Sequence, residues 1–163
     1  MLQRLYFPLT LAALVFGPMA YAKPADEAAI LKIERDMAEA QTADQALVAW
    51  DENAVLDDLL TTTPPTAEFV GLPAIRADVG SQLAGMSNIH AEILQIVVKA
   101  DGKLGFAHSV QRFTGKAKDG SNIELVFRES DCFEKKKGRW LLVHQHLSVP
   151  FDPATGKAVF NSK

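Results

Sequence analysis

The second half of the chain carries a strand-and-turn pattern, and this feature constrains the fold more than any other. Three dipeptides typical of β-hairpin turns, Asp101-Gly102, Asp119-Gly120 and Lys137-Gly138, punctuate it. Glycine in such turns adopts positive φ at no steric cost. The turns separate four runs rich in β-branched and aromatic residues: 88–100, 104–116, 122–135 and 139–149. The pattern predicts a four-stranded antiparallel meander.

Three helices and a short strand are predicted ahead of the meander. The helices begin at Asp26, Asp44 and Pro73, residue types favoured at helix starts, and the third ends at Gly85. Residues 54–60 read as a strand. Apolar side chains at helical spacing mark the buried helix faces: Ile30, Ile33, Met37 and Ala40, then Leu47 and Trp50, then Ile75, Val79 and Leu83. Helices followed by a meander indicate the α+β class.

The first 22 residues have the composition of a signal peptide. A basic Arg4 precedes an apolar stretch, and Ala20-Tyr21-Ala22 matches an A-x-A cleavage site. We therefore expect residues 1–22 to be removed, a domain over residues 23–152, and a loose C-terminal tail over 153–163. The expected location is periplasmic or secreted, with no membrane association after cleavage. An uncleaved N-terminal anchor is the alternative.

Composition excludes several classes of protein. The 163 residues are 48% hydrophobic and 23% charged, as in an ordinary globular protein. The formal charge is −3 with no basic block, so a nucleic-acid partner is not expected. Cys132 is the only cysteine, which rules out an internal disulfide. We expect it to be a small buried apolar residue rather than a nucleophile, because the neighbouring acids would raise the pKa of its thiol.

The hairpin turns also predict which side chains meet across the sheet. If the last two turns each contain two residues, His108, Asp131 and His144 share one row of a sheet face. A second row holds Val110, Glu129 and His146, and a third holds Arg112, Phe127 and Ser148. Trp140 lies at one end of this face as a packing residue. Polar groups among aromatic side chains are typical of a ligand pocket, although a solvated face with paired ions is the alternative.

The C-terminal half resembles a known family. The segment Arg128-Glu129-Ser130-Asp131-Cys132-Phe133 and the ending Trp140-x-x-Val143-His144-x-His146-x-Ser148 are similar to the SnoaL-like and ketosteroid-isomerase-like branch of the nuclear transport factor 2 (NTF2) superfamily. The ending is also similar to the association domain of calcium/calmodulin-dependent kinase. Upstream, Glu68-Phe69-Val70-Gly71 before Ala74-Ile75-Arg76 fits the same family. The resemblance covers roughly residues 27–152.

This resemblance implies a cone-shaped α+β barrel, in which three N-terminal helices pack in a curved, mostly antiparallel sheet around an internal pocket. Members include isomerases, dehydratases, polyketide cyclases and epoxide hydrolases, beside pockets without known chemistry. It also implies a homodimer through the outer sheet surface, where we expect Leu141, Val143 and Leu147. Within the family, an Asp on the short strand or a His–Asp pair commonly moves a proton. Asp58 matches the strand position best, with Asp57 one residue away.

Two function classes follow from these residues. The first is an exported small-molecule enzyme of the isomerase, dehydratase or cyclase type that works by acid–base catalysis. Its catalytic residues would be Asp58, Asp131 and His144, and its pocket would be lined by His108, Arg112, Glu129, His146, Trp50 and Phe127. The second is a non-catalytic ligand-binding or protein-assembly domain, in which Asp131 and His144 form a structural pair. No cofactor is expected. A metal held by the histidines and an acid is a rival interpretation, which we set aside.

Overall fold

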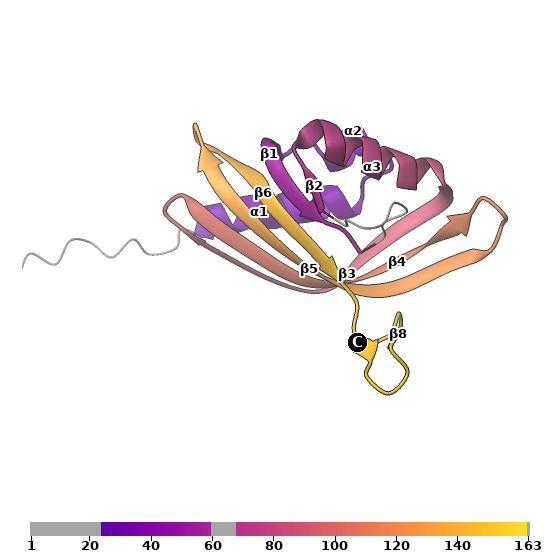
Figure 1. Ribbon diagram of the computed structural model, residues 1–163. Helices are drawn as coiled ribbons and strands as arrows, with labels where there is room; N and C mark the ends of the chain where they lie inside the picture. Colours follow the sequence, from indigo (N-terminus) through magenta and orange to yellow (C-terminus); the bar gives the residue numbers. More distant parts are fainter. Residues whose placement is uncertain (1–23, 60–67, 163) are drawn as a thin grey trace, which may run out of the picture.

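The computed structural model describes residues 24–59 and 68–162. The predicted signal peptide and the segment around Pro64-Pro65 lie outside the described residues. Figure 1 shows a curved sheet with the helices on its concave side, and a small C-terminal hairpin beyond the convex side. The helices are α1 (Pro24–Ala38), α2 (Ala43–Ala46) and α3 (Leu72–Ala84).

The main sheet has the strand order β2-β1-β6-β5-β4-β3, and its last four strands are the predicted antiparallel meander. β1 joins this meander by pairing parallel to β6, and the short β2 pairs antiparallel to β1. This is the expected cone-type α+β fold, with an open sheet in place of a closed barrel. The strands are β1 (Trp50–Asp57), β2 (Glu68–Val70), β3 (Met86–Asp101), β4 (Leu104–Ala117), β5 (Asn122–Lys136) and β6 (Arg139–Ser148), with β7 (Phe151–Asp152) and β8 (Lys157–Ala158) in the hairpin.

The segment around Trp50 differs from the prediction. It was expected to end the second helix, but α2 is a single turn capped by the Thr42 side chain, which accepts from the Gln45 amide. Trp50 instead begins β1 and lies opposite Leu142 of β6. A short amphipathic segment gives too few apolar positions to separate a helical period from a strand period, so tertiary pairing decided the outcome.

The core lies between α1, α3 and the concave side of the sheet. Ile30 and Ile75 contribute from the helices, and Phe133 and Leu142 from the sheet, each at most 1% exposed. Gly105 on β4 permits the close approach of α1, because a Cβ there would lie 2.5 Å from Cδ1 of Ile30. The helices are thereby held deep inside the curve of the sheet.

The hairpin between β4 and β5 has a different register from the one predicted. Ala117 donates its amide to the carbonyl of Ser121, so the loop has three residues, with Gly120 at φ 83°. Such a loop ends in a left-handed glycine and moves the pairing by one residue relative to a two-residue turn. His108 therefore lies opposite Ser130, and Asp131 lies opposite Ala107.

The next hairpin has the predicted turn but an unpredicted bulge. Lys137 and Gly138 both have positive φ, as a two-residue turn requires. An irregularity between Cys132 and Phe133 then shifts the pairing, so that Asp131 lies opposite Gln145. His144 lies opposite Cys132 instead. The predicted rows joining the histidines to Asp131 and Glu129 are wrong, because a one-residue shift turns a side chain to the opposite face.

Candidate functional site

The concave face of the sheet buries a set of polar side chains that the helices cover. Alternation along β5 directs Glu129 and Asp131 inward, at 9% and 1% exposure. Gln111 on β4 and Gln145 on β6 flank them at 4% and 8% exposure. From the other side α1 contributes Glu34, which is 1% exposed. Three carboxyl groups therefore meet in the interior of the protein.

The two glutamines hold part of this carboxyl cluster, defined here as Glu34, Glu129 and Asp131. Gln111 donates from Nε2 to Glu129 Oε1 at 2.7 Å, and Gln145 donates from Nε2 to Asp131 Oδ2 at 3.4 Å. Each acid offers one oxygen within 4.8 Å of the others. Both Glu34 oxygens and Asp131 Oδ1 are buried without a hydrogen-bond partner among the described residues.

Burial and mutual repulsion keep protons on the cluster. Burial raises the pKa of Glu129 to about 8, with the neighbouring carboxyl group of Glu34 as a further cause. The pKa of Asp131 is raised well above its ordinary value by burial and then by the charges of Glu129 and Glu34. Burial also raises the pKa of Glu34. At neutral pH the cluster therefore retains protons, which its unpartnered oxygens can share as hydrogen bonds.

A cavity of about 200 Å³ opens in front of the carboxyl cluster. Its polar lining residues are Gln41, His90, Gln111, Glu129 and Gln145, and Trp50 and Phe127 also line it. The indole Nε1–H of Trp50 is buried and has no acceptor within residues 24–59 and 68–162. The remaining wall is largely apolar and includes Met37, Leu47, Val79, Leu83, Ile89, Phe113 and Leu147. A few polar groups among apolar walls suit a small organic ligand.

A neighbouring cavity of about 140 Å³ contains Asp58. Gln82 of α3 donates from Nε2 to Oδ2 of Asp58 at 2.6 Å and to Oδ2 of Asp78 at 2.7 Å. Burial, together with a hydrogen bond to Asp58 and its charge, raises the pKa of Asp78 to about 6. The two cavities share five apolar lining residues: Val79, Leu83, Phe113, Phe127 and Leu147.

The structure divides the predicted site residues into two groups. Trp50, Phe127 and Glu129 line the first cavity, and Asp58 lines the second. Asp131 lies in the carboxyl cluster behind Glu129. The residues of the second group point to the convex face. They are Asp57, His108, Arg112, His144 and His146.

Two further expectations fail because of the same strand alternation. Cys132 is exposed on the convex face, since its neighbours Asp131 and Phe133 point inward. Leu147, expected on the outer surface, lines both inner cavities. Trp140 is 6% exposed on the concave side, as predicted, and donates from Nε1 to Asp26 Oδ1 at 3.1 Å.

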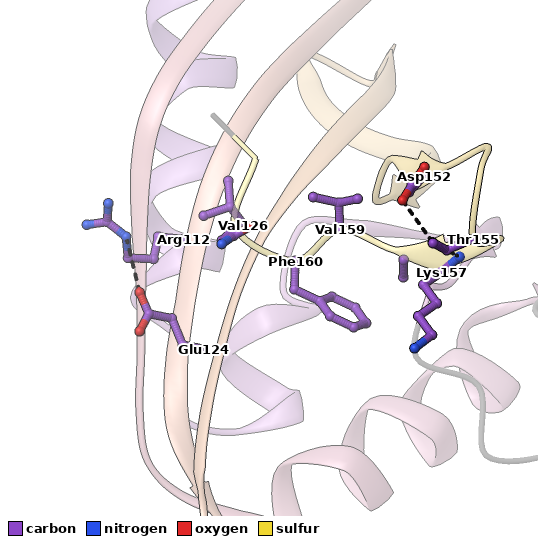
Figure 2. Close-up of a pocket in the computed structure, with 10 residues that line it drawn as sticks. Arg112, Glu124, Val126, Asp152, Thr155, Lys157, Val159 and Phe160 are labelled. Carbon is purple, nitrogen blue, oxygen red and sulfur yellow. Dashed lines mark hydrogen bonds and ion pairs between the residues drawn. The ribbon is translucent and has the colours of Figure 1, made fainter.

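Arg112 lies in an outer groove of about 870 Å³ between the sheet and the C-terminal tail (Figure 2). The tail is docked there, because the Val126 amide donates to the carbonyl of Phe160 at 2.6 Å. Figure 2 shows Arg112 paired with Glu124, and Asp152 accepting from the Thr155 hydroxyl, at 4.0 and 2.9 Å. These polar groups are engaged with one another, so the inner cavities are the stronger candidate site.

Sequence reasoning missed Glu34, Gln111 and Gln145. Glu34 carries a usable signal, since it follows Ile30 by four residues and therefore lies on the apolar stripe of α1. A charged residue on such a stripe is rarely buried without a function or a partner. The glutamines carry no such signal, because only the correct register places them beside the acids.

The carboxyl cluster could in principle hold a cation instead of protons. Its three oxygens have suitable spacing for a hard divalent ion. Burial favours protons on Glu129 and Asp131 although the glutamine N–H donors by themselves favour the charged form. It is these N–H groups, and not the amide oxygens, that face the acids. Amides that assist a cation present their oxygens to it. The cluster is therefore described best as a set of protonated and partly shared carboxyl groups.

Within residues 24–59 and 68–162, none of the helices is both long enough and apolar enough to cross a membrane.

Comparison with solved structures shows the fold. An NTF2-like protein of unknown function from Pseudomonas putida KT2440 is 23% identical, with a TM-score of 0.76 over 87% of this chain and 99% of that one. A type 2 hexachlorocyclohexane dehydrochlorinase (LinA) is 12% identical, with a TM-score of 0.65 over 76% and 84%. The association domain of CaMKII from C. elegans is 19% identical, with a TM-score of 0.59 over 76% and 95%.

Among curated proteins, none matches this sequence closely. At the family level, however, the SnoaL-like domain matches residues 30–152. This range contains the six strands of the main sheet and all residues of both cavities. The chain therefore has an NTF2-like fold and belongs to the SnoaL-like domain family.

Proposed function

We propose that this protein binds a small organic molecule in its concave cavity and acts on it by acid–base catalysis, with Glu129 as the proton-transferring group. The observation that carries the proposal is the position of Glu129. It lines the cavity, and burial raises its pKa to about 8. A group whose pKa lies close to the working pH is effective both as acid and as base.

The surroundings of Glu129 support this role. Gln111 fixes one of its oxygens by donating at 2.7 Å. Glu34 and Asp131 lie behind it and can exchange protons with it inside the cluster. Trp50 lines the same cavity. A ligand carbonyl oxygen that accepted a hydrogen bond from protonated Glu129 would be polarised, which favours proton removal at the adjacent carbon.

Asp58 is a candidate for the second proton-transferring group. It lines the neighbouring cavity, whose apolar walls are partly the walls of the first. Gln82 fixes its side chain through a 2.6 Å hydrogen bond. A ligand reaching from one cavity into the other would have Glu129 at one end and Asp58 at the other. In isomerisation and dehydration, one such group can remove a proton while the other donates one. His144 is not included, because it points to the opposite face.

The test follows solvent deuterium into candidate ligands. A panel of small ketones, aldehydes and lactones is incubated with the protein in D2O and analysed by mass spectrometry. We expect deuterium to enter at least one compound beside its carbonyl group. Glu129→Gln should slow this exchange by about 100-fold or more. Glu124→Gln is the matched control, because Glu124 lies on the same strand but is exposed.

The result is conclusive only if both variants keep the fold, which circular dichroism checks. Exchange that continues at the same rate in Glu129→Gln would contradict the proposal. A panel with no exchange in the unaltered protein would contradict carbonyl acid–base chemistry altogether.

A non-catalytic binding or assembly function is the second candidate, and one observation favours it. Val70, Val97 and Phe106 have exposures of 62%, 43% and 46%. Their register positions place all three on the convex face. A second copy of the chain covering this face would give a homodimer. One structural neighbour is by name an association domain. Ligand binding without deuterium exchange would favour this candidate.

We further propose export with cleavage after Ala22, on the grounds of the A-x-A segment. Intact mass measured on protein from the periplasmic or culture fraction should correspond to a chain that begins at Lys23. A mass that includes Met1 would contradict cleavage.

A further inference from the structure

The convex face carries a row of polar side chains that the concave site does not use. Cross-strand pairing joins Glu68 to Asp57, Asp57 to His146, His146 to Ser130 and Ser130 to His108. Paired residues point to the same face of a sheet. His144 lies two residues before His146 on β6 and therefore shares this face. Two imidazoles and two carboxylates thus gather over β2, β1 and β6.

Asp57 lies between the two imidazoles and contacts both. Its Oδ2 lies 3.0 Å from Nε2 of His144 and 3.8 Å from Nδ1 of His146. In a tetrahedral zinc site with bonds of about 2.0 to 2.1 Å, ligand atoms lie about 3.3 Å apart. The two distances from Asp57 are already close to that value. Rotation of an imidazole ring about its side-chain torsions must then bring the two nitrogens together.

The three side chains have the freedom that this rotation needs. Their exposed fractions are 39% for His144, 52% for His146 and 36% for Asp57. The backbone beneath them is paired without interruption, from Val55 to Asp57 on β1 with His144 to His146 on β6. Two histidines separated by one residue on a strand need a further ligand from a neighbouring strand. Asp57 on β1 is in the correct position to supply it.

We propose that Asp57, His144 and His146 bind a divalent transition-metal ion of the zinc type on the convex face. Two neutral imidazoles and a carboxylate are ligands that suit Zn²⁺ and Co²⁺, whereas Mg²⁺ and Ca²⁺ prefer oxygen alone. Glu68, the cross-strand neighbour of Asp57, adds negative charge beside the site. Three protein ligands leave one tetrahedral position open to water or to a group from another molecule.

This site is independent of the proposed acid–base function, since it lies on the other face of the sheet. It also differs from the buried carboxyl cluster in ligand type and in access to solvent. The convex face is the one proposed to meet a second copy, so the stoichiometry can be one ion per chain or one ion per two chains. Either stoichiometry supports the proposal.

The test is a Co²⁺ and Zn²⁺ titration of protein without added histidines. It is done in a Cys132→Ser background, because the exposed Cys132 thiol could itself bind these ions. Co²⁺ binding is followed by its visible absorption, which becomes intense in a tetrahedral site, and Zn²⁺ by its displacement of Co²⁺. We expect saturable binding of Zn²⁺ and no competition from a large excess of Mg²⁺.

Single substitutions then locate the site. Asp57→Asn and His144→Ala should each weaken Zn²⁺ binding at least 10-fold. His90→Ala is the control for a histidine elsewhere, because His90 is exposed on β3. Glu129→Gln is the control for the carboxyl cluster. Neither control should change the affinity.

Absence of saturable binding would overturn the proposal, as would full affinity in Asp57→Asn and His144→Ala. Loss of binding in Glu129→Gln alone would assign the ion to the carboxyl cluster and would also overturn it. Circular dichroism confirms that each variant is folded before its affinity is compared.

Discussion

The two faces of β5 and β6 show how burial, rather than residue type, separates the chemistry of this protein. On the concave face Glu129, Asp131 and Gln145 are at most 9% exposed, and the pKa of Glu129 is raised to about 8. On the convex face His144 and His146 are 39% and 52% exposed, and both lie near the Asp57 carboxylate. Neighbouring residues along one strand therefore enter environments of very different polarity.

The comparison puts the residues of the proposed acid–base site and those of the proposed metal site on opposite sides of one sheet. A buried carboxyl group holds its proton because the charged form loses its hydration. An exposed imidazole keeps its contact with solvent and with any ion that solvent carries. The effects of substitutions on the two faces should therefore differ in size and in their dependence on pH.

The largest effect is expected at the buried aromatic end of the concave face. Trp140→Ala removes a side chain that is 6% exposed and that hydrogen-bonds to Asp26. We expect a loss of about 3 to 5 kcal/mol in the free energy of unfolding. Phe106→Ala on the convex face, where Phe106 is 46% exposed, should cost about 1 kcal/mol or less. Urea unfolding measures the free energy of unfolding of both variants. Equal losses in the two variants would contradict the assignment of Trp140 to the concave face and Phe106 to the convex face.

The next effect concerns pH. Glu129 loses its proton near pH 8 in the folded protein, against an ordinary value of 4.5. Between these values the folded state holds a proton that the unfolded state has released, so stability falls as the pH rises. Glutamine does not ionise, so Glu129→Gln removes this fall in stability with rising pH. We expect the variant to match the unaltered protein near pH 5 and to exceed it by on the order of 3 kcal/mol near pH 8.

Urea unfolding at several pH values measures this difference. Glu124→Gln, which changes an exposed acid on the same strand, should show no such dependence. A Glu129→Gln effect of constant size from pH 5 to pH 8 would show that Glu129 is ionised throughout the range.

A smaller effect is expected at the contact between α1 and β4. Gly105→Ala places a Cβ 2.5 Å from Cδ1 of the fully buried Ile30 and 3.2 Å from the carbonyl oxygen of Lys99. Overpacking of this kind costs about 1 to 3 kcal/mol. Gly115→Ala on the same strand meets atoms no closer than 3.4 Å and should cost less. Thermal melts compare the two, and a larger loss for Gly115→Ala would contradict the packing of α1.

The smallest effect on folding is expected for a charge on the convex face. Phe106→Glu should leave the melting temperature of the separated chain nearly unchanged, because Phe106 is 46% exposed. It should nevertheless convert a homodimer to a monomer by placing repelling charges at the shared face. Light scattering at micromolar concentration measures the molar mass in solution and so distinguishes dimer from monomer. A monomer before substitution would contradict the proposed dimer.

Much of the fold was predictable because the signals are local. The four strands of the meander follow from β-rich runs and glycine turns, and α3 follows from Pro73, its apolar stripe and Gly85. The residue motifs that indicated a SnoaL-like domain were confirmed by the family match over residues 30–152. Each of these signals depends on residues close in sequence, where propensity and periodicity are informative.

The site was only partly predictable because it depends on register. Trp50, Phe127 and Glu129, which the sequence predicted to line a pocket, line the first cavity. His108, Arg112, His144 and His146 were placed on the wrong face. A single extra loop residue before Ser121 and one bulge beside Cys132 reversed the assignment. Side chains alternate with a period of two, so no sequence pattern that tolerates a one-residue error can assign a face.

The sequence by itself determined α1, α3, the antiparallel order of β3 to β6 and the family. Only the tertiary structure decided that Glu34 of α1 meets Glu129 and Asp131 across the core, and that Asp57 meets the two histidines outside it. These contacts join residues far apart along the chain. Their geometry is set by where α1 enters the curve of the sheet and by how β1 pairs with β6, and neither quantity is encoded in a local pattern.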